Sequence, residues 1–192
     1  MSSFEPDDEY VSFDLDDDND DDDFDDLDDL EDASDDDIDF CVAVYREEGE
    51  VVAAALPNET ANDLDELIAQ LLRLPGEAGS IGFVSLVDDV FIAVRVRGRK
   101  VQVLLSDGLA GEDWPLARDV LDYLGVDLDD DDLDDDEVEP VGDLEIFADL
   151  GLGDFDVEAL IDALDDSSEQ VFTIVDRIGF GPQVRRVVEA EF

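Results

Sequence analysis

Residues 80–106 read SIGFVSLVDDVFIAVRVRGRKVQVLLS, and the fold can be worked out from them. Over residues 80–87, 90–97 and 100–106, apolar side chains either alternate with polar ones or occupy consecutive positions, a pattern typical of β-strands. The breaks between them are short: Asp88-Asp89 and Gly98-Arg99. Because connections this short join antiparallel neighbours, the stretch predicts a three-stranded antiparallel meander.

Further elements are predicted on the N-terminal side of the meander. Residues 40–47 and 50–56 predict a two-stranded hairpin that turns at Glu48-Gly49. A helix follows, with Asn62 placed as its N-terminal cap and Pro75-Gly76 beyond its end. Its buried stripe has the spacing of one helical face and consists of Leu64, Leu67, Ile68, Leu71 and Leu72.

On the C-terminal side, helices dominate. A second helix is predicted directly after the meander, because Pro115 fits a first helical turn and Gly125 can end the helix. Apolar stripes over residues 157–164 and 171–178 predict two more helices. Residues 143–152 fit either a helix or a strand.

Two details complete the C-terminal prediction. Ser167 and Gln170 are spaced as a capping box between the two helical stripes. Gly181-Pro182 opens a short last helix.

These elements together predict an α+β domain. Its antiparallel sheet consists of the hairpin and the meander, with two packed helices and a C-terminal helical segment. We expect the helices on one face of the sheet and the other face solvated or shared. The same order of elements occurs in profilin-like folds of the longin and roadblock type, which are mostly interaction platforms.

The charge divides the chain into parts. Its 192 residues hold 60 acidic and 10 basic side chains, for a net charge of −50. Residues 1–39 contain 22 acidic and no basic residues, and residues 127–139 contain 10 acidic and no basic residues. Such dense like charge opposes folding. We therefore predict a disordered acidic tail at 1–39 and one domain at 40–192 with an acidic insertion at 127–139.

The same composition excludes many functions. A strongly negative field repels free nucleic acid and anionic membranes. The chain has no histidine, so imidazole catalysis and histidine-based metal sites are absent, and the single Cys41 in a predicted strand fits a core position. No secretory signal or membrane span is apparent, so we expect a cytoplasmic protein.

Motifs for cofactors and catalysis are missing as well. Neither acidic run has the glycine of a calcium-binding EF-hand loop, and there is no dinucleotide fingerprint, P-loop or nucleophile elbow. Paired carboxylates are so frequent that they identify no general acid and base. We therefore expect no catalytic residue, no cofactor and no dedicated metal site.

The acidic tail carries regularly spaced apolar residues. Phe24, Leu27 and Leu30 recur every three residues, which would place them near one face of a transient helix. Acidic segments of this kind can dock onto a basic, grooved partner, or the tail can simply keep the protein solvated.

The one basic feature is Arg95, Arg97, Arg99 and Lys100. On a strand Arg95 and Arg97 share a face, and the turn adds the other two charges. One interpretation is a charged hairpin end that pairs with nearby carboxylates. The other is an anion-binding tip that holds the chain's own acidic tail when no partner is present.

Several short motifs resemble a known family. They are Leu74-Pro75-Gly76-Glu77, the run from Ser80 to Ser85, Arg95-Val96-Arg97-Gly98, Leu105-Ser106-Asp107, Trp114 to Gly125, Pro140 to Leu144, and Ile178 to Gly181. From residue 40 onward the chain resembles the actinobacterial tRNA adenosine deaminase-associated protein family, most specifically over residues 114–125.

What the resemblance implies is an accessory role. The family takes its name from genes beside that of a tRNA adenosine deaminase, and it brings no catalytic residue or cofactor. The chain is not the deaminase itself, because it lacks the Cys and His ligands that a zinc deaminase needs.

Three functions are compatible with the sequence. The first is a non-catalytic protein that binds a tRNA adenosine deaminase, or another tRNA-handling enzyme, through acidic surface that mimics tRNA phosphates. The second is an enzyme with a carboxylate metal site. The third is an interaction domain whose acidity only solvates it. We expect the first.

Overall fold

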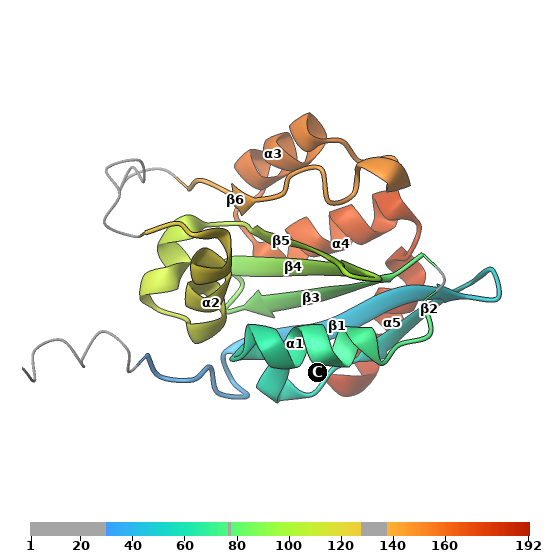
Figure 1. Ribbon diagram of the computed structural model, residues 1–192, viewed down its shortest axis with the longest axis horizontal. Helices are drawn as coiled ribbons and strands as arrows, with labels where there is room; N and C mark the ends of the chain where they lie inside the picture. Colours follow the sequence, from blue (N-terminus) through green and yellow to red (C-terminus); the bar gives the residue numbers. More distant parts are fainter. Residues whose placement is uncertain (1–29, 77, 128–137) are drawn as a thin grey trace, which may run out of the picture.

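A six-stranded antiparallel sheet forms the centre of the computed structural model, which describes residues 30–76, 78–127 and 138–192 (Figure 1). The strand order is β2-β1-β3-β4-β5-β6. The strands are β1 (Ile38–Glu47), β2 (Glu50–Ala55), β3 (Ser80–Leu86), β4 (Val90–Arg97), β5 (Lys100–Leu105) and β6 (Val141–Gly142). The predicted hairpin and meander are confirmed, while the two-residue β6 was not predicted.

The predicted helices are confirmed too. They are α1 (Leu64–Leu72), α2 (Pro115–Leu124), α3 (Asp154–Ala163), α4 (Ser167–Ile178) and α5 (Gly181–Glu191). Within the described residues, three short 3-10 helices are added: η2 (Asn58–Ala61), η3 (Gly108–Glu112) and η4 (Ala148–Leu150). Residues 143–152 are therefore neither a regular α-helix nor a strand, but turns and η4. Among the described residues, no helix has the length and apolar character needed to cross a membrane.

Helices cover both faces of the sheet, so the expectation of one solvated or shared face is wrong. α1 and α2 pack on one face, against Cys41 and Ala43 of β1. α3, α4 and α5 pack on the other, against Phe40, Val42 and Val44 (Figure 1). Every residue of β3 is buried. A strand buried on both faces needs apolar residues at consecutive positions, as Phe83 and Val84 provide.

The cap of α1 is Asp63 and not the predicted Asn62. The Asp63 backbone is extended, and its side chain accepts a hydrogen bond from the Glu66 backbone N–H at 3.1 Å. The Asn62 side chain instead bonds to both the N–H (2.7 Å) and the C=O (3.1 Å) of Ala33. Asn62 therefore anchors the segment that precedes β1.

The predicted capping box of α4 is also wrong. The cap is Asp166, which accepts a hydrogen bond from the Glu169 backbone N–H at 3.2 Å. Ser167 is buried, and its hydroxyl lies 2.7 Å from that of Ser85 on β3. Gln170 turns toward the end of α3. Both side chains form hydrogen bonds with other elements and do not cap α4, and the spacing of residues along the chain does not reveal such contacts.

The structured part of the chain begins before residue 40. β1 starts at Ile38, and Ala33 is already buried. The carbonyl of Asp37 accepts a hydrogen bond from Val87 N–H at 2.8 Å. Residues 33–39 thus pack against the domain, although they were predicted as part of the tail; Phe24 and Leu27 lie outside the described residues.

Candidate functional site

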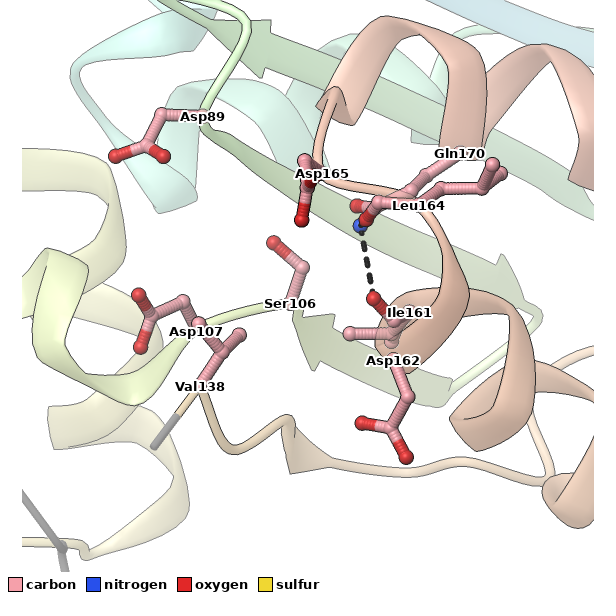
Figure 2. Close-up of a pocket in the computed structure, with 9 residues that line it drawn as sticks. All are labelled: Asp89, Ser106, Asp107, Val138, Ile161, Asp162, Leu164, Asp165 and Gln170. Carbon is pink, nitrogen blue, oxygen red and sulfur yellow. Dashed lines mark hydrogen bonds between the residues drawn. The ribbon is translucent and has the colours of Figure 1, made fainter. Parts of the chain in front are cut away.

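A cavity of about 520 Å³ opens between the β3–β4 turn, the start of η3 and the connection from α3 to α4 (Figure 2). We call it the acidic pocket. Its polar lining consists of Asp89, Ser106, Asp107, Asp162, Asp165 and Gln170, and its apolar lining of Val138, Ile161 and Leu164. The charged groups of this lining are all carboxylates, so the pocket has a strongly negative potential.

The β3–β4 turn brings Asp89 to the pocket. Val87 and Asp88 have positive φ angles of 47° and 53°. Residues other than glycine rarely adopt such angles, and they are least favourable for a β-branched residue such as valine. The turn is held by hydrogen bonds from Val87 N–H to Asp37 C=O and from Asp88 N–H to an Asp39 carboxylate oxygen, 2.7 Å away. The contacts of residues 37–39 therefore stabilise a turn that the local sequence disfavours.

Ser106 and Asp107 reach the pocket from the end of β5. The Asp107 side chain caps η3 by accepting a hydrogen bond from Leu109 N–H at 3.0 Å. The Ser106 hydroxyl accepts one from Phe91 N–H at 2.9 Å. Burial raises the pKa of Asp107, the capping bond opposes this rise, and the negative charge of Asp89 adds to it.

Gln170 provides an unused acceptor in the wall of the pocket. Gln170 is only 4% exposed, and its side-chain amide nitrogen donates hydrogen bonds to the carbonyls of Ile161 (3.2 Å) and Leu164 (2.5 Å). Because both neighbours are acceptors, the NH₂ group must face them, and this fixes the position of the carbonyl oxygen Oε1. Oε1 is buried and has no hydrogen-bond partner among the described residues.

Asp162 and Asp165 come from the C-terminal end of α3 and the connection after it. A helix C-terminus carries a partial negative charge from its free carbonyls. This end of α3 therefore strengthens the negative potential that the two exposed carboxylates produce.

Within the described residues, the pocket lacks the arrangement expected for catalysis by a metal or a thiol. No three Asp, Glu, Cys or His side chains in this part of the chain converge closely enough to hold a metal ion. Cys41 is a fully buried core residue, as predicted, and burial raises the pKa of its thiol to about 12. What the pocket offers is a set of separated hydrogen-bond acceptors.

A partly buried polar cluster connects this region to β1. The Asp39 carboxylate accepts hydrogen bonds from Asp88 N–H (2.7 Å) and the Ser85 hydroxyl (2.9 Å). Ser168 donates to the Asp88 carboxylate at 2.8 Å. Desolvation raises the pKa of Asp39, and the negative charges of Asp88 and Asp166 add to this rise. The hydrogen bonds from Asp88 N–H and the Ser85 hydroxyl oppose it.

These carboxylates predict an unusual dependence of stability on pH. Asp39, Asp107 and Asp119 have folded-state pKa values above 3.8, so the folded protein binds more protons than the unfolded chain and its stability increases as pH falls toward that range. Asp149 and Asp176 have lowered values, and the stability that they contribute is lost below pH 3.8. We expect thermal unfolding to show maximal stability at mildly acidic pH; a continuous loss of stability from pH 7 downward would contradict this.

The basic residues separate into two groups. Arg95 is 2% exposed, and its guanidinium donates to the Ile146 carbonyl at 2.8 Å and to the Asp149 carboxylate at 2.9 Å. Arg97 is partly exposed and lies 3.3 Å from the same carboxylate. These arginines hold the pKa of Asp149 below its usual range. Arg95 thus points into the protein, which corrects its placement on an exposed tip.

The other predicted site residues that the structure describes lie at or near the surface. Arg99 and Lys100 are exposed at the β4–β5 turn, and Leu30 is half-buried at the start of the described chain. Of the residues predicted for partner binding, those that the structure describes do not line the acidic pocket. The pocket residues escaped sequence-based selection because aspartates are too common in this chain to single any out.

Comparison with known proteins places the described domain in context. The model of a family described as Rv3753c-like tRNA adenosine deaminase-associated protein matches residues 39–181, a range that includes every residue of the pocket lining. The chain is 30% identical over 151 residues to Protein Rv3753c of Mycobacterium tuberculosis, an alignment that covers 78% of this chain and 87% of the relative. No solved structure matches, so the likeness to longin-type folds stays a prediction.

Proposed function

Because the chain belongs to the Rv3753c-like tRNA adenosine deaminase-associated protein family, we propose that it is a non-catalytic accessory protein that binds a tRNA adenosine deaminase or another tRNA-handling enzyme. The binding surface is the acidic exterior of the domain together with the acidic tail. It occupies the basic groove of the enzyme that otherwise receives the phosphates of tRNA.

The observation that carries this proposal is the scarcity of neutralising contacts. The net charge is −50, and in the described part of the chain only Asp149 and Asp176 form ion pairs with arginines. Arg46 lies over the Phe180 ring and Arg185 over the Phe172 ring. With four of the ten basic residues engaged in these contacts, most surface carboxylates stay free to attract a basic partner.

Binding to the purified tRNA adenosine deaminase of the same organism tests the proposal. The full chain should be compared at low salt with a version that starts at Leu30. A cut after residue 39 would remove Ile38 from β1 and Asp39 from the partly buried polar cluster. We expect both versions to bind and the full chain to bind more tightly, because residues 1–29 add 16 carboxylates. Failure of both to bind would reject the proposal.

Two roles are proposed for the tail and the basic turn. Phe24, Leu27 and Leu30 contact the partner when the tail docks. Without a partner, the tail lies against the basic turn at Arg97, Arg99 and Lys100, which attract its carboxylates.

Limited proteolysis at low salt tests the contact between tail and turn. Arg97→Ala/Arg99→Ala/Lys100→Ala should speed cleavage of the tail several-fold, because the charges that hold it are gone. Arg95 is left unchanged because it is buried. Arg73→Ala/Arg118→Ala removes positive charge elsewhere and serves as the control. Equal cleavage of the triple variant and the natural chain would end this proposal.

A further inference from the structure

We propose that the acidic pocket binds a guanidinium group. Asp89, Asp107, Asp162 and Asp165 supply its negative charge, and Gln170 Oε1 supplies a neutral acceptor within the cavity (Figure 2). The ligand we infer is the side chain of an arginine.

Gln170 is the observation that distinguishes this pocket from ordinary acidic surface. A buried carbonyl oxygen without a donor is unfavourable, by roughly 1–3 kcal/mol. The orientation of the amide is fixed by its bonds to the Ile161 and Leu164 carbonyls, so the group cannot rotate to remove the deficit. In Figure 2 the carboxamide lies at the wall of the pocket, between Asp165 and Ile161, and is directed toward the cavity.

The spread of the carboxylates selects an organic cation and not a metal ion. A divalent metal needs several oxygens within about 2.0–2.6 Å of one point. No such convergence of carboxylates exists among the described residues, whereas the lining surrounds a volume of about 520 Å³. A cation with several separated donors fits that geometry.

The apolar part of the lining favours guanidinium over ammonium. Val138, Ile161 and Leu164 form part of the pocket wall. An ammonium group is strongly hydrated and behaves as a compact point charge, so contact with such a wall costs it water. A guanidinium is planar and weakly hydrated, and it presents five N–H donors in a fork that can reach two carboxylates and a carbonyl at once.

The identification of the ligand as a partner's arginine rests on the proposed function, while the guanidinium site itself does not. An enzyme that binds tRNA needs exposed basic side chains for the phosphates. Such an arginine could enter the acidic pocket when the two proteins meet, and a buried charge-assisted contact of this kind would dominate the binding energy.

Ethylguanidinium and propylammonium are suitable probes, because they carry equal charge and differ in the head group. Titrated into the full chain, ethylguanidinium should shift the amide NMR resonances of Leu109 and the side-chain NH₂ of Gln170 in a saturable way, with a dissociation constant on the order of millimolar. Propylammonium should bind about tenfold more weakly. Equal, non-saturating shifts with both probes, or saturable Mg²⁺ binding in the pocket at micromolar concentration, would overturn the proposal.

A pair of matched variants tests the residues. Asp162→Asn/Asp165→Asn removes two exposed carboxylates of the pocket and should weaken ethylguanidinium binding at least about tenfold. Asp65→Asn/Asp122→Asn removes the same charge from α1 and α2 on the opposite face of the sheet. It should change the affinity for ethylguanidinium less than about twofold. Equal weakening in both variants would show that only the overall charge matters and would overturn the site.

Binding of the deaminase to the same variants separates the two proposals. If the pocket receives the enzyme's arginine, Asp162→Asn/Asp165→Asn should weaken the complex far more than the control variant. If ethylguanidinium binds as expected but the enzyme does not bind at all, the proposed function fails while the guanidinium site stands. Equal enzyme binding by both variants would overturn the assignment to a partner arginine.

Discussion

Arg95→Ala is expected to lower the free energy of unfolding by about 2–3 kcal/mol, whereas Arg97→Ala, two residues along the same strand, should lower it by less than about 0.5 kcal/mol. Both arginines contact Asp149. They differ in burial, because the Arg95 side chain is 3% exposed and the Arg97 side chain 37%.

The physical reason is the position of Arg95 beneath the segment that leads into α3. Its guanidinium connects β4 to the Ile146 carbonyl and to both Asp149 oxygens. Without it, the buried Ile146 carbonyl and the cavity left by the side chain remain uncompensated. The expected loss lies below the full cost of breaking a buried ion pair because Asp149 is half exposed and water can reach it.

Chemical denaturation of Arg95→Ala, Arg97→Ala and Asp149→Asn provides the measurement. The free energy of unfolding of Asp149→Asn should lie between those of the two arginine variants, because this substitution leaves Arg95 bonded to the Ile146 carbonyl. Arg95→Met keeps most of the side-chain volume and isolates the contribution of the guanidinium. If Arg95→Ala and Arg97→Ala were equally stable, Arg95 would not have the structural role assigned to it.

Arg95 also shows how far the sequence can predict this fold. Its alternation with Arg97 correctly places both on one face of a strand, because strand geometry is local. Whether that face is covered depends on residues 143–150, which lie more than 45 positions away and have no regular pattern. The same limit explains why the second helical layer on the sheet was not foreseen.

Local patterns succeeded where one element determines its own structure. The first turn of α2 at Pro115 was predicted, and so was the buried stripe of α1 except for Leu72, which is 58% exposed. Helical spacing and capping chemistry act over a few residues. Ser167 and Gln170 fit a local capping pattern equally well, yet tertiary partners engage both. The spacing of a capping motif is thus insufficient to predict a helix cap when a polar side chain has a buried partner elsewhere.

The candidate site was the least predictable part. Asp89, Asp107 and Asp165 come from three segments that only the folded sheet and the α3–α4 connection bring together. In a chain with 60 acidic residues, no spacing distinguishes these three from the others. The unsatisfied oxygen of Gln170, which marks the pocket, exists only in the folded protein.

A large salt effect on the complex with the deaminase is the second major expectation. The Debye length shortens from about 30 Å at about 0.01 M salt to about 10 Å at about 0.1 M and about 3 Å at about 1 M. Attraction between a chain of net charge −50 and a basic groove acts over those distances. We therefore expect affinity to fall about a hundredfold between about 0.01 M and about 0.5 M salt, largely through slower association.

The stability of the domain must be checked in parallel, since salt also reduces repulsion among its own carboxylates. Added salt should stabilise the folded protein while it weakens the complex. These opposite directions separate loss of binding from loss of structure, which thermal unfolding at each salt concentration would verify.

The most direct measurement is a titration of the purified tRNA adenosine deaminase with the full chain at several salt concentrations, repeated in the presence of the cognate tRNA. We predict saturable binding at low salt, a loss of affinity of about a hundredfold as salt rises, and displacement by tRNA. Absence of binding at low salt, or an affinity that changes with neither salt nor tRNA, would contradict the role of the acidic surface.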